Sequence, residues 1–200
     1  MTARTPRRPR PRPGRATGPA GTTAVGSLAL LVVLAGCTTA DAAPDDTASA
    51  TTAEVPGLPV TLTVPAGWVD LSRDGAFVVA APDEGSAVVR SNVVVTGELS
   101  AESIEDAATD TTRYAEGLDG WQPGSGAPEP VTVAGAPAVR VDGTYDADGT
   151  LVAQEIVVLE TGTGSDRWVV RFTTTAAADD LDAATQVGDV LESVALTPGR

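Results

Sequence analysis

Cys37 constrains this chain more than any other residue, because it is the only cysteine among 200 residues. No intramolecular disulfide can form, so a folded part must be held together by an ordinary hydrophobic core. The cysteine closes the run Leu34-Ala35-Gly36-Cys37, which follows an apolar stretch and an arginine-rich start. A basic segment, an apolar segment and small residues, in that order, are typical of a secretory signal. With a cysteine directly after Leu-Ala-Gly, the pattern predicts cleavage before Cys37 and lipidation of its thiol.

The apolar stretch from Ala24 to Ala35 is too short to cross a membrane as a helix, which needs about 20 apolar residues. A plain secretory signal or a short anchor is the alternative, but neither explains a cysteine at this position. A single acyl chain holds a protein only marginally at a membrane, whereas several chains anchor it durably. We therefore expect a signal peptide, palmitate or a similar acyl group on Cys37, and a lipid-anchored, extracytoplasmic protein on the outer face of the cytoplasmic membrane.

Composition divides the chain into four parts. Residues 1–36 form the expected signal peptide, and residues 37–57 combine the lipidated cysteine with a linker of Ala, Thr, Asp, Ser and Pro. The linker has no apolar period and cannot bury enough surface to fold, so we expect it to be disordered. Residues 58–196 are the size of one domain, and residues 197–200 are a short tail.

The expected mature chain is strongly acidic. All 27 acidic residues follow Cys37, while six of the 13 basic residues precede it, which leaves 7 basic residues and a net charge of −20. Proteins that bind nucleic acid carry basic patches, so this charge argues against a nucleic-acid partner. An acidic, well-solvated domain held off the bilayer by its tether fits the charge better.

Apolar periodicity predicts an α+β fold with an antiparallel sheet of about six strands and two main helices packed on it. The strands are expected at 60–64, 76–81, 88–96, 138–145, 151–160 and 167–175, with a turn into 68–71 and a short lead-in at 131–134. Turn sequences at 146–149 and 161–164 predict hairpins. One helix is expected from Ala101 to Glu116 with Ser100 as N-cap, and another from Asp180 to Val194 with Asp179 or Asp180 as N-cap.

The inventory of reactive side chains argues against an enzyme. The chain has no histidine, which excludes a Ser-His-Asp or Cys-His arrangement and an imidazole ligand for zinc. Its only thiol is expected to carry lipid. A pair of carboxylates in a cleft remains conceivable, but nothing in the sequence brings two of them together. No phosphate-binding loop or dinucleotide fingerprint is present, so no cofactor is expected.

One acidic run suggests an alternative function in binding metal. Asp142, Asp146 and Asp148, followed by Gly149, resemble the start of a calcium loop built from oxygen ligands. Counted from Asp146, the fifth and twelfth positions should hold further ligands, but they are Thr150 and Val157. An Asp-Gly hairpin turn explains the run more simply, so no metal ligands are assigned.

Tryptophans are the best candidates for contacts with an apolar ligand. Trp168 alternates with Val170 and Phe172 along one expected strand, and Trp68 stands at a strand start, so both are expected to pack in the core. Trp121 follows the first helix in a loop. It is expected to cover the core or, alternatively, to contact a ligand or partner.

Arginines are the only cations of the expected mature chain. Three of them stand on predicted strands: Arg90, Arg140 and Arg171. Neutralising nearby acids on the solvent face explains them, and an anionic ligand is the alternative, so Arg90 and Arg140 join Trp121 as candidate binding residues.

Several local runs, in this order of elements, resemble the actinobacterial LpqN/LpqT-type lipoproteins, whose domain has a PsbP-like α/β fold. The runs are Val64-Pro65-Ala66-Gly67-Trp68, Ser91-Asn92-Val93-Val94-Val95, Val133-Ala134-Gly135-Ala136-Pro137-Ala138-Val139-Arg140 and Gly143-Thr144-Tyr145. The resemblance covers roughly residues 58–196 and carries no catalytic signature. It implies a non-enzymatic accessory or binding protein of the cell envelope.

Together these features predict a membrane-anchored envelope lipoprotein that binds either an envelope protein or an apolar, lipid-like envelope molecule. An exposed patch over a closed core would favour the protein partner. A cavity between sheet and helix would favour the apolar molecule. Extracytoplasmic calcium binding is the alternative function.

Overall fold

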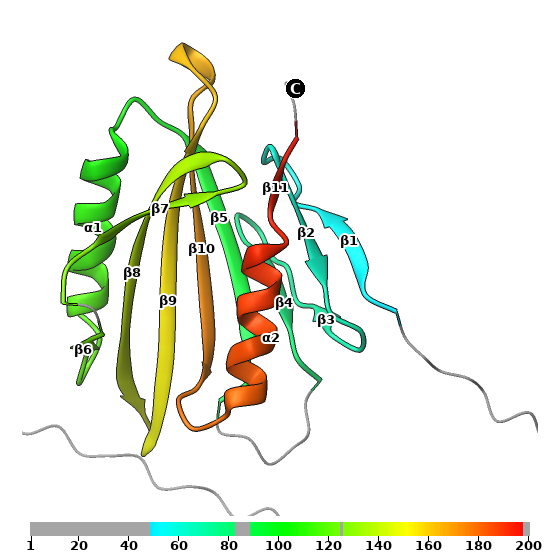
Figure 1. The fold of residues 1–200 in the computed structure, drawn as a ribbon, viewed down its shortest axis with the longest axis vertical. Coiled ribbons are helices and arrows are strands. Elements are labelled where there is room, and N and C mark those ends of the chain that lie inside the picture. Colours follow the sequence, from blue (N-terminus) through cyan, green and yellow to red (C-terminus); the bar gives the residue numbers. More distant parts are fainter. Residues whose placement is uncertain (1–48, 83–88, 125, 198–200) are drawn as a thin grey trace, which may run out of the picture. The chain divides into compact units, whose positions relative to one another are not determined.

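The computed structural model describes residues 49–82, 89–124 and 126–197 (Figure 1). They belong to one compact unit, Pro44–Arg200. The described part contains two α-helices and two antiparallel sheets, which confirms the α+β class expected from periodicity. Cys37 and the expected signal peptide lie outside the described residues.

The main sheet has eight strands rather than about six. Its path runs through β3 (Val69–Asp70), β4 (Phe77–Ala80), β5 (Asn92–Leu99), β10 (Trp168–Ala177), β9 (Thr150–Thr161), β8 (Ala136–Ala147) and β6 (Gln122–Pro123), and β7 (Glu129–Val133) pairs with β8. Five of the six expected strands form its centre, and the sixth, at residues 60–64, belongs to a second sheet. The strand count was too low because β3, β6 and β7 are short or exposed edge strands, which carry little alternation to recognise.

Two tight hairpins fix the register of the longest strands. Asp148 and Gly149 join β8 to β9 with φ values of 53° and 86°, and Ala134 and Gly135 join β7 to β8 with 51° and 80°. Positive φ at both loop residues matches the right-handed twist of the flanking strands. The hairpin predicted at residues 146–149 is therefore confirmed. The loop between β9 and β10 is longer than the predicted turn at residues 161–164, because Thr161 pairs with Trp168 and a short 3-10 helix, Gly164–Asp166, lies between them.

A second sheet corrects the expected boundary of the linker. Its three strands are β1 (Thr51–Glu54), β2 (Val60–Val64) and β11 (Ala195–Leu196), with β2 in the middle. Thr51–Glu54 was expected to be disordered, because the segment is nearly without apolar residues. It is ordered by backbone pairing with β2, and the next residue, Val55, is 3% exposed. The folded part thus begins before residue 58.

Both helices begin where a side chain caps them. Helix α1 spans Ile104–Glu116, and Ser103 Oγ accepts a hydrogen bond from Asp106 N at 3.1 Å. The predicted start at Ala101 was wrong, because Ser100 Oγ instead accepts from Glu102 N in the preceding turn. Helix α2 spans Leu181–Glu192, and its N-cap is Asp180, one of the two residues expected.

The two faces of the main sheet carry separate apolar clusters. The larger cluster contains Val170 and Phe172 of β10 with Val187 and Val190 of α2 and the inner side of β2. The smaller one contains Val169 of β10 with Ala107 of α1 and Val158 of β9. Because successive strand residues point to opposite faces, α1 and α2 cover opposite faces of the sheet. Figure 1 shows α1 alongside β8 and α2 in front of the sheet.

The tryptophans expected in the core lie at its edges. Trp168 is half-buried and packs against the larger cluster on the same face as Val170 and Phe172. Trp68 also packs there, and its indole Nε1 donates a hydrogen bond to Gln186 Oε1 of α2 at 3.2 Å. Both rings therefore contribute to packing, as their sequence positions predicted.

Candidate functional site

The residues singled out from the sequence do not come together at one site. Trp121 lies directly before β6 and against β8, Arg90 lies just before β5, and Arg140 lies on β8 beside β7 and β9. The sequence offered each as a separate candidate, and each has its own surroundings in the structure.

Trp121 covers the backbone of β8. A Cβ atom placed on Gly143 would lie 2.4 Å from Trp121 Cζ2 and 2.7 Å from its Cη2, so the ring rests where a side chain would otherwise stand. The ring is half-buried and also lines a small hollow with Pro123 and Val141. This position matches the expected cover over the core, while leaving one side of the ring open.

Two of the three arginines expected on strands form ion pairs on the sheet, while Arg90 precedes β5. Arg140 Nε lies 2.7 Å from Glu155 Oε1, and its Nη1 lies 3.7 Å from Glu129 Oε2. Arg171 Nη1 lies 3.3 Å from Glu98 Oε1. Arg90 instead donates from Nε to the backbone carbonyl of Ala81. Arg140 and Arg171 thus neutralise neighbouring acids, the simpler of the two roles expected.

The acidic run at residues 142–149 is a hairpin turn in the structure. Asp146 Oδ1 accepts a hydrogen bond from Gly149 N at 2.9 Å, and Asp148 occupies a left-handed loop position. Asp142 lies against Gly124, whose N–H donates to the Asp142 backbone carbonyl at 2.9 Å. Within the described ranges, no three His, Cys, Asp or Glu side chains are grouped so that they could hold a metal ion.

A groove of about 520 Å³ lies between α1 and the part of the sheet that α1 leaves uncovered. We call it the helix groove. Its floor comes from three strands and its wall from the helix: Val94 and Thr96 of β5, Arg171, Thr173 and Thr175 of β10, Gln154 and Ile156 of β9, and Asp110, Thr111 and Tyr114 of α1. Pairing of Val94 with Thr173, and of Thr173 with Ile156, places these floor residues side by side on one face. The volume falls in the range of about 300–1,000 Å³ that is usual for ligand sites.

Gln154 is the most unusual residue of the helix groove. Its side chain is 9% exposed, and its buried Oε1 has no hydrogen-bond partner among the residues described. Leaving a buried acceptor without a donor costs about 1–3 kcal/mol, so most buried amides are paired. The groove therefore contains an acceptor that a ligand bearing an N–H or O–H group could satisfy.

Arg171 fixes the wall of the helix groove to its floor. Its Nε donates to Thr111 Oγ1 of α1 at 3.4 Å, and Thr111 Oγ1 donates in turn to the Ala107 carbonyl at 2.8 Å. Tyr114, on the next turn of the helix, is 63% exposed at the groove rim. A fixed cation, several hydroxyl groups and an exposed aromatic ring thus surround an apolar floor.

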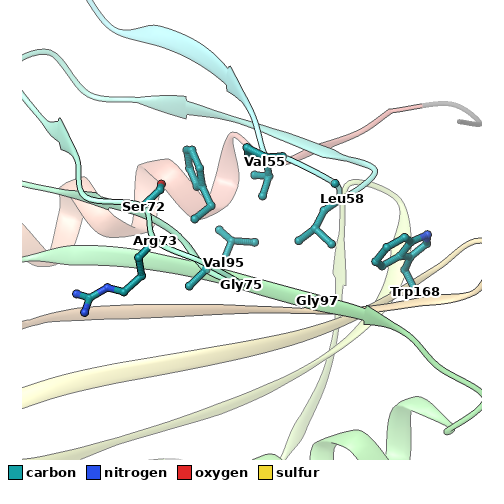
Figure 2. Close-up of a pocket in the computed structure, with 12 residues that line it drawn as sticks. Val55, Leu58, Ser72, Arg73, Gly75, Val95, Gly97 and Trp168 are labelled. Atoms are coloured by element: carbon teal, nitrogen blue, oxygen red, sulfur yellow. The ribbon is translucent and has the colours of Figure 1, made fainter.

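A second hollow, of about 290 Å³, lies on the opposite face, between the two sheets (Figure 2). We call it the inter-sheet pocket. Its apolar lining comes from the β1–β2 turn, the β3–β4 hairpin, β5 and the start of β10: Val55, Leu58, Phe77, Val95, Gly97 and Trp168. Ser72 and Arg73 stand at one side of it. Val95 and Gly97 alternate with the Val94 and Thr96 of the helix groove, so β5 separates the two sites.

Comparison with known protein families identifies the fold and its relatives. The family described as probable lipoprotein LpqN matches residues 46–195, which is most of the chain. The chain belongs to the LpqN family of lipoproteins. Its match begins before β1, in agreement with the ordered strand at Thr51–Glu54. Comparison with curated proteins gave no match.

Solved structures show the same LpqN-like fold. The structure of LpqN from Mycobacterium tuberculosis, described as involved in cell envelope biogenesis, matches with a TM-score of 0.60 and 18% identity over 74% of this chain and 91% of that chain. A structure from Bacteroides thetaiotaomicron matches with a TM-score of 0.51 and 15% identity over 74% of this chain and 48% of that chain. At such identities the likeness concerns the fold alone. The resemblance to PsbP domains stays a prediction.

In this LpqN-family protein, the residues of the helix groove had no distinctive sequence signal. Gln154, Tyr114 and the threonines stand on strands and a helix where polar residues ordinarily face solvent. Arg171 stood out in the sequence only as a scarce cation.

None of the helices in the described ranges is long and apolar enough to cross a membrane.

Proposed function

We propose that this protein is a lipid-anchored lipoprotein of the cell envelope that binds an amphipathic envelope molecule in the helix groove, without catalysing a reaction. Membership of the LpqN family supports the lipoprotein character, and the lipobox ending at Cys37 supports an anchor on the outer face of the cytoplasmic membrane. The related M. tuberculosis protein is described as involved in cell envelope biogenesis, and we extend that role to this chain.

The unpaired Oε1 of Gln154 is the observation that carries the ligand hypothesis. A folded protein keeps a buried, unsatisfied acceptor at a measurable cost, so a partner that donates to it gains binding free energy. The apolar floor at Val94 and Ile156 favours a ligand with an apolar body. The expected ligand therefore combines an apolar body with at least one hydroxyl or amide donor.

Non-catalytic binding is supported by the side chains that are present. Histidine is absent from the whole chain, and the only thiol is expected to be lipidated. The helix groove offers one carboxylate, Asp110, whose partner is Arg113 of the same helix. No observation in the described part of the chain favours the calcium-binding alternative.

Native mass spectrometry on the protein that begins at Thr38 tests the ligand hypothesis. That start retains β1 and the entire compact unit, Pro44–Arg200. Protein purified from an actinobacterial host should carry a lipid-sized mass, which Gln154→Leu should reduce. Gln186→Leu, a glutamine on α2 and thus on the opposite face, is the matched control and should keep the mass. Equal retention by all three proteins, or no retained mass in any, would contradict binding in the helix groove.

Fractionation of cells tests the anchor separately. The wild-type protein should partition with membranes, and Cys37→Ser should prevent lipidation and leave the protein outside the membrane fraction. Cys37→Ser protein that stays membrane-bound after high-salt washing would contradict a lipid anchor at Cys37.

A further inference from the structure

The inter-sheet pocket has the lining of a binding site for hydrocarbon. Val55, Phe77 and Val95 form its buried walls, with exposures of 3%, 8% and 1%. The half-buried Trp168 lies at one end (Figure 2). Its volume of about 290 Å³ is at the lower limit of ordinary ligand sites. The space therefore suits one narrow apolar chain better than a compact ligand or a lipid with several chains.

Two hydrogen-bonded turns hold the walls of the inter-sheet pocket apart. The β1–β2 turn is closed by Val55 N to Val60 O and Leu58 N to Val55 O, each at 3.1 Å. The β3–β4 hairpin is closed by reciprocal backbone bonds between Arg73 and Ala76, at 3.0 and 2.9 Å. Because both turns are braced in this way, the pocket belongs to the folded scaffold.

Leu58 is the adjustable part of the wall. A Cβ placed on Gly97 would lie 2.8 Å from Leu58 Cδ2 and 3.0 Å from its Cδ1, so the leucine methyl groups fill the space left by the glycine. Leu58 is half-buried, and the atoms near Gly97 are the ends of a flexible side chain. A rotamer change of Leu58 would widen the space above β5 without a change in the backbone.

Arg73 distinguishes this pocket from an ordinary gap in packing. Six arginines lie in the described ranges, and the guanidinium groups of five of them have hydrogen-bond or ion-pair partners there: Arg90, Arg113, Arg140, Arg167 and Arg171. The guanidinium of Arg73 has no such partner within those ranges, although the chain has 27 acidic residues. Figure 2 shows this side chain at the end of the pocket away from Trp168, extending outward. Asp74 is the other charged residue of this exposed turn.

We propose that the inter-sheet pocket is a second ligand site, which takes the hydrocarbon chain of a single-chain anionic amphiphile whose head lies at Arg73. The chain contacts Phe77, Val95 and Trp168, and the anionic head accepts charge-assisted hydrogen bonds from the guanidinium outside the apolar space. This site does not depend on the ligand proposed for the helix groove, because alternate residues of β5 line the two sites on opposite faces.

Dodecanoate and dodecanol are suitable probes, because they share a hydrocarbon chain and differ in the charge of the head. Calorimetric titration of the protein that begins at Thr38 should give measurable binding of dodecanoate and weaker binding of dodecanol. Arg73→Gln should weaken dodecanoate about tenfold, the size expected for one charge-assisted contact, and leave dodecanol unchanged. Ala76→Phe should fill the pocket and abolish binding of both.

Two matched variants keep the outcomes distinct. Arg113→Gln removes an exposed arginine on α1, and Gln154→Leu alters the helix groove; both should bind dodecanoate like the wild type. Wild-type protein that binds no dodecanoate, or equal weakening by Arg73→Gln and Arg113→Gln, would overturn the proposal. So would loss of dodecanoate binding in Gln154→Leu alone, which would place the amphiphile in the helix groove.

A third measurement separates a free amphiphile from a membrane surface. Co-sedimentation with phosphatidylglycerol vesicles should be the same for wild-type and Arg73→Gln protein. If Arg73→Gln reduced vesicle binding while leaving dodecanoate binding unchanged, Arg73 would recognise lipid headgroups at a surface, and the pocket would not be the site.

Discussion

The indole ring of Trp121 rests on the backbone of Gly143, 2.4 Å from the position that a Cβ atom would occupy. The Gln122 carbonyl oxygen is almost as close, at 2.5 Å from the same position. Strand β8 can therefore pass beneath the chain that follows α1 only because residue 143 has no side chain. Gly143 has no positive φ, so the requirement is for space rather than for backbone freedom.

Gly143→Ala should destabilise the protein by about 1–3 kcal/mol, the usual cost of inserting a methyl group into a packed site. The methyl group would meet both a ring and a backbone oxygen, and the oxygen cannot rotate away. Chemical denaturation would measure the loss, and the fluorescence of Trp121 should shift as the ring becomes more exposed. Unchanged stability would mean that the loop lifts from β8 without cost.

Gly188→Ala should have the opposite effect and stabilise the protein by about 0.5–1 kcal/mol. Gly188 lies inside helix α2, where glycine is unfavourable, and a Cβ at this position would meet no atom within 4 Å. Thermal unfolding would measure the stability of Gly188→Ala against the wild type and against Gly143→Ala. A loss of stability would show that the face of α2 around Gly188 is packed more tightly than the structure indicates.

Asp180→Ala should destabilise the protein by about 1 kcal/mol through the loss of the N-cap of α2. Asp180 Oδ1 accepts a hydrogen bond from Ala183 N at 2.9 Å, and its negative charge lies at the positive end of the helix dipole. Asp180→Asn keeps the acceptor and should recover most of the loss in denaturation experiments. Equal losses of stability in Asp180→Ala and Asp180→Asn would show that the negative charge, and not the capping hydrogen bond, stabilises the helix.

Gln154→Leu should stabilise the protein in the absence of ligand, by up to about 1–3 kcal/mol, because it removes a buried acceptor that has no donor. The same change should weaken ligand binding in the helix groove. Denaturation of ligand-free protein, together with the native mass spectra, would test both effects. A destabilised variant would show that Gln154 already has a donor in solution, such as an ordered water molecule.

Asp70 should give the β3–β4 hairpin a small pH-dependent stabilisation. Hydrogen bonds from the Ser72 side chain and backbone N–H hold the pKa of Asp70 below its ordinary value of 3.8. Because the folded protein favours the ionised form, this stabilisation is present above pH 3.8 and is lost as the pH falls through the lower folded pKa. Asp70→Asn should therefore be less stable than the wild type at pH 7, and the difference should disappear at acidic pH. If the difference in stability between Asp70→Asn and the wild type stayed the same from pH 7 to acidic pH, the cause would be packing and not ionisation of Asp70.

The hairpin between β8 and β9 shows how much local sequence predicted. Asp146 to Gly149 supply both the positive-φ residues and the side-chain acceptor that the turn needs, so the turn, its flanking strands and their pairing followed from adjacent residues. For the same reason the sequence limited the N-cap of α2 to Asp179 or Asp180, and the structure places it at Asp180. At β1 the prediction failed, because Thr51–Glu54 has no apolar pattern of its own and becomes a strand only through its partner β2.

The sequence by itself predicted the lipid anchor at Cys37, excluded histidine chemistry and indicated the α+β class. Each of these depends on single residues or on periods within one segment. Tertiary structure decided which of these segments meet. Thr96 lies beside Arg171 because β5 pairs with one edge of β10. Gln154 lies on the same face of the main sheet, in the helix groove, because β9 pairs with the other edge of β10. The helix groove and the inter-sheet pocket both arise from pairings between strands far apart in sequence. The free energy that selects such pairings comes from burial of apolar surface across the whole sheet and not from any local pattern.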